Sequence, residues 1–293
     1  MLTDAHCHPS DLSSFFPEFE EERRCLGVLA AASACMKSEY AQYYELSRNA
    51  VLNNSVPFFV CMGIHPQIFK IKNEQLTKNN EQRTMDKEQI TINNEQFMEG
   101  YEKFDFCDLM ETLELLASEK QIAAVGECGF DLFNNAFRET EALQERFFLP
   151  QIEIAIRHEL PVVLHVRRAI HRIFSFSNLL AKCKAVVFHS WPGTFEEAEA
   201  LLRKGINAYF SFGNTILLNH KQAIRSCALL PPDRLLTETD APYQPRRGHF
   251  FSQWSDLPLI LESASALRIE AGNKISINDL ENQIEINFRK VFL

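Results

Sequence analysis

The sequence predicts an α/β fold, a TIM-type (β/α)8 barrel with one heptad-repeat insertion after its third strand. Two observations lead to this class. Eight short apolar runs, of the kind that form buried parallel strands, alternate with stretches of helical periodicity. The chain of 293 residues also has about the length of such a barrel, roughly 250 residues, plus an insertion. Its hydrophobic content of 46 % supports a large core, and we expect residues 1–293 to form a single domain.

The eight apolar runs are bounded by polar or turn-forming residues, which set the limits of the predicted strands. In chain order, the predicted strands are 2–8, 27–33, 58–65, 122–128, 161–166, 185–190, 208–213 and 235–240. Between and after them, helical patterns cover 38–52, 106–120, 138–159, 195–204, 257–271 and 277–292. Pro150 lies inside one of these patterns and predicts a kink or a break, because proline has no N–H and its ring crowds the preceding turn.

The insertion, at residues 71–100, has a seven-residue period of its own. A four-residue unit occurs four times, as Lys72-Asn-Glu-Gln75, Asn79-Asn-Glu-Gln82, Asp86-Lys-Glu-Gln89 and Asn93-Asn-Glu-Gln96. A coiled-coil seam needs two apolar positions in each heptad, whereas the columns here mix apolar with charged residues. We therefore expect an exposed, partly helical or mobile excursion, with binding of a partner as the alternative.

Charge and composition restrict the classes of function. The formal charge of −9 argues against a duplex-reading protein that gains affinity from many basic contacts, but an enzyme needs positive charge only at the reacting phosphate. Two arginine pairs, Arg167-Arg168 and Arg246-Arg247, are candidates for that charge. No leader-like or membrane-spanning apolar stretch occurs, so we expect a cytoplasmic location. The eight scattered cysteines have no C-x-x-C spacing and predict mostly buried thiols.

Side chains that bind metals lie at the ends of five predicted strands. In Asp4-Ala-His6-Cys-His8, alternation along a strand predicts that Asp4, His6 and His8 face one side. The later strand ends supply Glu127, His165, His189 and Asp240. Because the carboxyl ends of barrel strands meet at one mouth, these residues predict a metal site there.

Six ligands (His6, His8, Glu127, His165, His189 and Asp240) exceed the needs of one ion and fit two ions that share a carboxylate. The mixture of imidazole and carboxylate suits Zn, Mn, Fe or Co better than Mg. Two such ions, about 3.5–4 Å apart, activate a water and stabilise a leaving oxygen, which is hydrolytic chemistry. The sequence therefore predicts a two-metal hydrolase whose cofactors are divalent ions, with Zn, Mn or Mg as the candidates.

Taken in order, the motifs resemble those of the TatD family of metal-dependent deoxyribonucleases, a branch of the amidohydrolase-like barrels. The resemblance covers nearly the whole chain outside the insertion. The matching segments are Asp4-Ala-His-Cys-His8, Gly63-Ile-His-Pro66, Gly126-Glu-Cys-Gly-Phe-Asp131, Gln144 with Phe148 and Gln151, His165-Val-Arg-Arg-Ala169, His189-Ser-Trp-Pro-Gly193, Glu238-Thr-Asp-Ala-Pro-Tyr243, Arg247-Gly248 and Asn287-Phe-Arg-Lys-Val-Phe292.

The resemblance implies that His6, His8, Glu127 and Asp240 hold one ion, and that Glu127, His165 and His189 hold the other. The implied catalytic residues are Glu127, His65 and Asp240, of which Asp240 would orient or deprotonate the attacking water. His65 would contact substrate phosphate or, alternatively, cap the strand before Pro66. Arg167 would bind phosphate or, alternatively, pair with an acidic loop, and Glu238 would support the face that carries Asp240.

Three departures from the family pattern concern substrate rather than metal. Gln67 stands where the family often has a second histidine, and Leu132 and Phe133 follow Asp131 in place of an immediate aromatic residue. Trp191 occupies a loop that is usually smaller, where it would stack a nucleic-acid base or cover the barrel rim.

The leading hypothesis is a hydrolase that cleaves phosphodiester bonds of DNA, acting as an exonuclease on single-stranded ends. One alternative keeps the metal site and replaces DNA with a small ester, lactone or amide, because fold does not fix function. Another is an inactive scaffold that binds a partner through the insertion. The sequence leaves the oligomeric state open.

Overall fold

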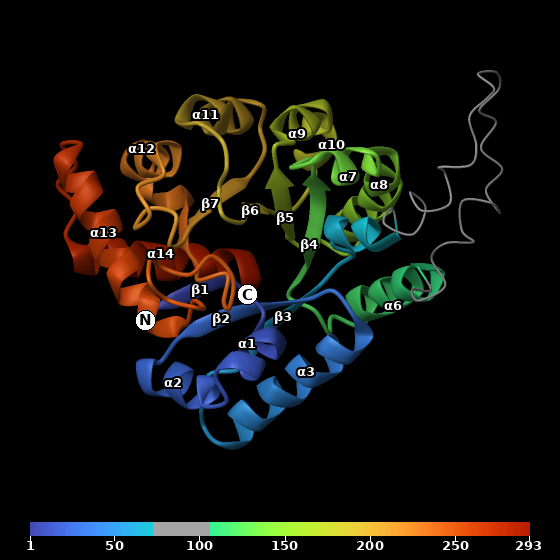
Figure 1. Cartoon of the computed structure of the whole chain (residues 1–293), viewed down its shortest axis with the longest axis horizontal. Helices are drawn as coiled ribbons and strands as arrows, with labels where there is room; N and C mark the ends of the chain where they lie inside the picture. The colour runs from blue at the N-terminus through green and yellow to red at the C-terminus, as the bar shows by residue number, and fades with distance from the viewer. Residues whose placement is uncertain (73–105) are drawn as a thin grey trace.

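The structure, a computed structural model, describes residues 1–72 and 106–293. Most of the predicted insertion at 71–100 therefore lies outside the described residues. In the described ranges, eight parallel strands form one sheet in chain order (Figure 1). The strands are β1 (Thr3–Cys7), β2 (Leu29–Ala34), β3 (Phe58–Met62), β4 (Ala124–Asp131), β5 (Val162–Arg167), β6 (Val186–Phe188), β7 (Ala208–Phe212) and β8 (Leu235–Thr237).

The first and last strands meet at a seam that closes the barrel. The backbone N–H of Asp240 donates to the carbonyl of His6 at 3.0 Å, and the N–H of His8 donates to the carbonyl of Ala241 at 2.8 Å. Both bonds lie just beyond the end of β8, which stops three residues earlier than the run at 235–240 predicts. The predicted TIM-type barrel is confirmed, and the residues after β8 continue toward its mouth.

Helices surround the strands in the expected alternation (Figure 1). The helical segments are α1 (Pro9–Phe15), α2 (Phe19–Leu26), α3 (Lys37–Leu52), η1 (Pro66–Lys72), α6 (Phe106–Ser118), α7 (Asn135–Arg138), α8 (Glu141–Arg157), α9 (Ile170–Ser175), α10 (Ser177–Leu180), α11 (Phe195–Arg203), α12 (Lys221–Leu229), η2 (Pro232–Arg234), η3 (Trp254–Asp256), α13 (Leu257–Glu270) and α14 (Ile277–Phe292). None of the described helices is long and apolar enough to cross a lipid bilayer.

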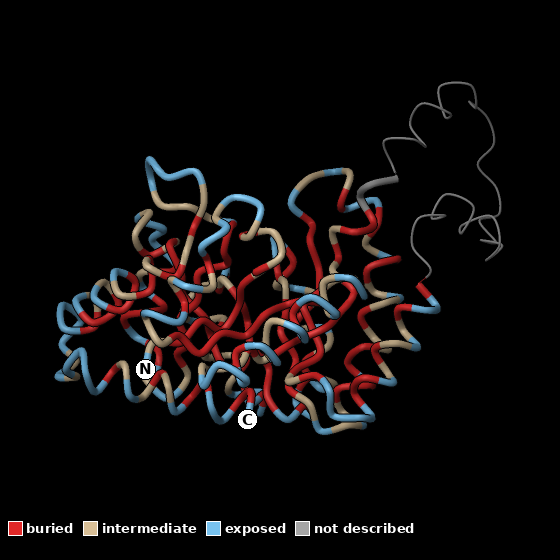
Figure 2. The backbone as a smooth tube through the Cα atoms, turned by 90° about the horizontal axis from the view of Figure 1, so that it is seen from below, coloured by how far each residue is buried: buried red, intermediate tan, exposed pale blue. Residues whose placement is uncertain are grey.

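Most of the buried residues, which are red in Figure 2, belong to two apolar clusters. The larger lies between the strands and the surrounding helices. The smaller fills the barrel with strand residues such as Ala31 and Val163 and includes Phe288 and Phe292 of α14. Helix α14 thus closes one end of the barrel, while the carboxyl ends of the strands form the mouth at the other.

Two local expectations need correction or refinement. The break considered at Pro150 is wrong, because α8 runs as one helix from Glu141 to Arg157. The pattern at 138–159 starts three residues too early, because α8 begins at Glu141 and Arg138 is the last residue of the preceding helix α7. The eight cysteines are free thiols and five of them are buried, as expected.

Candidate metal centre

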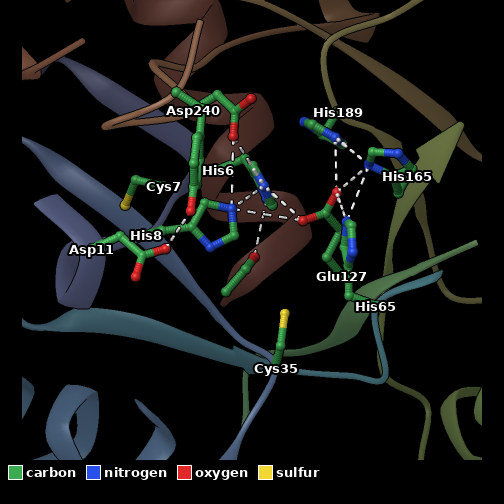
Figure 3. A network of polar contacts seen from close by, with 12 residues as sticks. His6, Cys7, His8, Asp11, Cys35, His65, Glu127, His165, His189 and Asp240 are labelled. Atoms are coloured by element: carbon green, nitrogen blue, oxygen red, sulfur yellow. Dashed lines mark hydrogen bonds and ion pairs between the residues drawn. The ribbon is translucent and has the colours of Figure 1, made fainter. Parts of the chain in front are cut away.

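The six predicted ligands come together at the barrel mouth (Figure 3). His6 lies in β1, Glu127 in β4 and His165 in β5. His8, His189 and Asp240 follow the ends of β1, β6 and β8. Separate strands of one barrel therefore deliver all six side chains to one place, as the strand-end rule predicts.

Asp4 does not join this group. The pairing of β1 with β2 shifts register between Asp4 and Cys7, which disrupts the simple alternation on which the prediction relied. The Asp4 carboxylate instead accepts hydrogen bonds from the Thr239 N–H at 3.0 Å and the Thr239 hydroxyl at 2.6 Å. Burial raises the pKa of Asp4 to about 8. Its role is to attach β1 to the segment that leads into Asp240.

A second register shift, between Gly126 and Cys128 in β4, accompanies the placement of Glu127 at the mouth. Gly126 has a φ of 146°, and a Cβ there would lie 2.4 Å from the carbonyl oxygen of Val163. Only glycine fits this position. The Cys128 side chain packs with the apolar cluster outside the strands, so it does not serve as a ligand.

The first ligand group surrounds Oε2 of Glu127. This oxygen lies 3.1 Å from Nε2 of His6 and 3.7 Å from Nε2 of His8. Oδ1 of Asp240 lies 3.6 Å from each of the same two nitrogens. The two imidazole nitrogens are themselves 3.1 Å apart. The donor atoms of His6, His8 and Asp240 form one cluster that fits a divalent ion with nitrogen and oxygen ligands, and Oε2 of Glu127 adjoins its two histidines.

The second group surrounds the other oxygen, Oε1 of Glu127. It lies 2.7 Å from Nδ1 of His165, 2.9 Å from Nε2 of His189 and 3.2 Å from Nε2 of His65. Figure 3 shows Glu127 between the two groups, with contacts from separate carboxylate oxygens. One carboxylate oxygen of Glu127 therefore faces each donor group.

Hydrogen bonds behind the histidines fix how their rings face the centre. Nδ1 of His6 lies 3.0 Å from the Ser33 hydroxyl, and Nε2 of His165 lies 3.2 Å from Oδ2 of Asp131. With the far nitrogen engaged, Nε2 of His6 and Nδ1 of His165 face inward, as metal ligation requires. Ser33 and Asp131 were not assigned a role from the sequence; for Asp131, its place at the end of β4 beside β5 was the available signal.

His65 differs from the other histidines in its hydrogen bonding. Its Nδ1 accepts the N–H of Gln67 at 3.1 Å. A neutral imidazole carries one proton, so this bond leaves the proton on Nε2, which faces Glu127. In that tautomer His65 donates a hydrogen bond from Nε2, although the same side chain lies in one donor cluster with Glu127 and His165.

The electrostatics of the group centre on Glu127. Burial alone would raise the pKa of this carboxyl, but the surrounding imidazoles of His65, His189 and His6 hold it well below its usual range. Burial and the neighbouring His189 lower the pKa of His6 to about 3. The ionised Glu127 therefore faces a neutral His6, the protonation states in which both bind metal. Burial opposes protonation of His165 and His189, but neighbouring carboxylates raise the pKa of both rings, so a metal ion would have to displace protons there.

Asp240 is held from two sides. Its Oδ1 belongs to the first ligand group, and its Oδ2 accepts a hydrogen bond from Nε2 of Gln244 at 2.6 Å. Oε1 of Gln244 lies 3.0 Å from the Ser190 hydroxyl. Gln244 was missed from the sequence, because nothing in the spacing indicates that the chain turns back after Asp240. The carboxylate of Asp240 is thereby oriented toward the centre.

The structure also decides several predictions about substrate contacts. Trp191 is only 3 % exposed and packs against Phe188 and Phe210, so base stacking by this ring is wrong. The Nε2 group of Gln67 donates to Oδ2 of Asp131 at 2.7 Å. Arg246 pairs with Asp256 at 2.5 Å, which neutralises its charge.

The barrel and its histidine–carboxylate centre define the class of metal-dependent α/β-barrel hydrolases. Within this class, the family model described as "TatD related DNase" matches residues 3–293. The chain therefore belongs to the TatD family, and it is an enzyme of the metal-dependent nuclease kind.

Curated relatives support the same assignment. The chain is 34 % identical over 193 residues to "3'-5' ssDNA/RNA exonuclease TatD" of Pantoea ananatis, covering 63 % of this chain and 71 % of the relative. A relative of the same name from Erwinia tasmaniensis is 35 % identical over 190 residues, covering 62 % of this chain and 70 % of the relative.

Solved structures show the same fold. The TatD homolog YJJV from Escherichia coli K12 has a TM-score of 0.75 at 21 % identity, covering 99 % of this chain and 97 % of that chain. A hydrolase TatD family protein from Entamoeba histolytica has a TM-score of 0.71 at 16 % identity, covering 100 % and 98 %.

Proposed function

We propose that the protein hydrolyses phosphodiester bonds of DNA with two divalent ions, and that it removes nucleotides from single-stranded ends. The main support for this proposal is the placement of the Glu127 carboxylate. Its Oε2 lies in one ligand group and its Oε1 lies in the other. The names of the curated relatives, which specify single-stranded DNA and RNA, support the choice of substrate. We also propose that the protein is located in the cytoplasm.

The donor set names the residues that would hold each ion. His6, His8, Asp240 and Oε2 of Glu127 would hold one ion, and His165, His189 and Oε1 of Glu127 would hold the other, as the distances between these atoms favour. The imidazole-rich donors favour Zn or Mn over Mg. When bound, such ions would polarise the phosphoryl oxygen, lower the pKa of the attacking water and stabilise the leaving oxygen.

Side chains at the mouth would orient the reactants. Asp240, held by Gln244, is placed to accept a proton from the attacking water. His65 presents an N–H that can donate to a phosphate oxygen when substrate displaces its contact with Glu127. The Arg167 side chain is 46 % exposed and would contribute positive charge to substrate phosphate.

The test uses metal-stripped protein with end-labelled single-stranded DNA, duplex DNA and RNA, and restores Mg, Mn, Zn or no metal. We expect metal-dependent release of mononucleotides, fastest from single-stranded DNA. Glu127→Ala should lower the rate by about 10³-fold or more, because the carboxylate common to both groups is lost. Glu270→Ala, at a solvent-exposed position of α13, is the control and should leave the rate unchanged.

Two outcomes would contradict the proposal. Full activity of a folded Glu127→Ala variant would exclude this centre as the catalytic site. Absence of cleavage with any metal, in protein shown to bind two ions, would favour a small ester, lactone or amide, which a parallel substrate panel identifies.

A further inference from the structure

Two arginine side chains share one aromatic ring beside the metal centre. Phe133, in the loop after β4, is exposed. The guanidinium carbon of Arg167 lies 3.7 Å from the centre of the Phe133 ring, and that of Arg168 lies 4.7 Å from it. Arg168 also donates from Nη1 to the Phe133 carbonyl at 3.2 Å. One residue therefore positions two positive charges at the mouth.

The backbone explains how neighbouring arginines reach the same ring. Consecutive side chains of an extended strand point to opposite faces. Arg167 ends β5, and Arg168 has a φ of 55°, so the chain leaves the extended conformation between them. The two guanidiniums repel each other, and attraction to the ring offsets only part of that cost. Such a pair suits a ligand with closely spaced negative charges.

The charges of the pair are available to a ligand. Arg168 has no carboxylate within ion-pair distance among the described residues, and Arg167 lies 4.0 Å from Oδ2 of Asp131. That carboxylate already accepts hydrogen bonds from Gln67 and from the Phe133 N–H. By contrast, Arg246 and Arg172 are both paired with carboxylates at short distances.

The pair also lies close to the second ligand group. Oδ2 of Asp131, the nearest carboxylate oxygen to Arg167, is 3.2 Å from Nε2 of His165. Oδ1 of the same carboxylate accepts the Phe133 N–H at 2.9 Å. The turn that orients a metal-binding histidine thus also carries the ring that orients the arginines. A strand whose reacting phosphate is at the metal centre would bring its next phosphates to this pair.

We propose that Phe133, Arg167 and Arg168 form a subsite for the internucleotide phosphates that flank the reacting one, with Phe133 as its positioning residue. This inference rests on the proposed nuclease function and narrows its substrate to chains of several nucleotides. An isolated phosphodiester, which has no flanking phosphate, does not use the subsite.

The test compares a single-stranded DNA oligonucleotide with bis(p-nitrophenyl) phosphate, which has a single phosphate. In Phe133→Leu, we expect KM for the oligonucleotide to rise about tenfold while kcat stays within about twofold. Hydrolysis of bis(p-nitrophenyl) phosphate should not change. Phe133→Tyr retains the ring and should restore the KM of the unaltered protein.

Salt dependence provides a second readout. Removing one phosphate contact with Arg168→Gln should reduce the slope of log KM against log salt concentration by about 0.7 for a single strand. Arg203→Gln, an equal change of charge at an exposed position on α11, is the control and should leave the slope unchanged.

The outcomes separate this inference from the function on which it rests. An unchanged oligonucleotide KM in Phe133→Leu would overturn the subsite. An equal loss on both substrates would also overturn it, because it would show a general effect on the metal centre. If the unaltered protein hydrolyses neither substrate with any metal, the proposed nuclease function itself fails.

Discussion

At the scale of single residues, Asp131 orients a histidine of the proposed metal centre. It is fully buried, lies 3.2 Å from Nε2 of His165 and accepts a hydrogen bond from Gln67. It therefore fixes both the tautomer and the ring plane of His165. Its neighbour Phe133 belongs to the same turn, so one short segment serves the metal centre and the arginine pair.

We predict that Asp131→Asn lowers metal affinity or activity by about 10–100-fold, because an amide holds the His165 proton less strongly than a carboxylate does. Calorimetric titration with Mn or Zn and turnover of single-stranded DNA measure the effect. Asp233→Asn, an exposed carboxylate at η2, is the matched control. Unchanged affinity and turnover in Asp131→Asn would show that His165 is oriented without it.

The residues predicted from the sequence are those whose position follows from a simple rule. His6, His165 and Asp240 could be proposed because strand ends converge at a barrel mouth. Asp4 was misplaced because a register shift in β1 leaves no mark in the pattern of apolar residues. Gln244 could not be proposed, because its contact depends on the path of a loop.

At the scale of elements, helix α8 connects the outer layer to the mouth through Gln151. The side chain is 1 % exposed. Its Oε1 accepts the Ile64 N–H at 2.6 Å, and its Nε2 donates to the carbonyls of Ile64 and Phe147. Ile64 directly precedes His65, so α8 determines where the loop after β3 places that imidazole.

We predict that Gln151→Leu reduces the free energy of unfolding by about 1–3 kcal/mol, because the buried N–H and carbonyl of Ile64 lose their partner. Chemical denaturation measures the change. Gln121→Leu, which removes an exposed amide, should change the free energy by less than about 0.5 kcal/mol. Equal stability of the two variants would show that another group satisfies the Ile64 backbone.

Helix α8 also shows why one prediction failed. Pro150 disfavours a helix locally, but α8 continues through it, with Phe148 and Ile152 buried on either side. Packing of these residues against the barrel outweighs the local cost. The sequence shows the local preference, whereas the compensating contacts come from residues that are distant in the chain.

At the scale of the whole molecule, aromatic contacts hold together the two ends of the segment at 73–105. The rings of Phe69, before this segment, and Phe106, after it, have centroids 5.4 Å apart. Both pack against Phe147 of α8, at 5.4 and 4.8 Å. The barrel therefore joins the flanks of this segment by its own packing.

We predict that replacing residues 73–105 with a short glycine–serine linker leaves turnover within about twofold and the unfolding midpoint unchanged, because a short loop can join adjacent ends. Thermal unfolding and the single-stranded DNA assay measure this. Phe106→Ala in the full chain is the comparison and should cost about 3–5 kcal/mol. A folded but inactive linker variant would show that the segment contributes to turnover. The scaffold alternative makes a different prediction, that the full chain is inactive and that the linker variant loses binding of a partner.

The architecture was the most predictable level, because eight alternating apolar and helical units leave few topologies open. Strand limits were less certain. The predicted strand covers residues 235–240, yet β8 ends at Thr237 and residues 238–240 turn toward the mouth. The apolar pattern of the sequence indicates which residues are buried. It does not indicate where the hydrogen-bonded pairing of the strands ends.

The seam between β1 and β8 gives the centre a place in the order of folding. The bond from the Thr239 N–H to Asp4 joins residues 235 positions apart, and His6 and Asp240 are next to it. Contacts across such a separation carry a high loop-closure cost, which the chain must meet before they form. The first ligand group is therefore complete only after the segment that follows β8 docks on β1. A partly synthesised chain contains His6 and His8 but lacks Asp240.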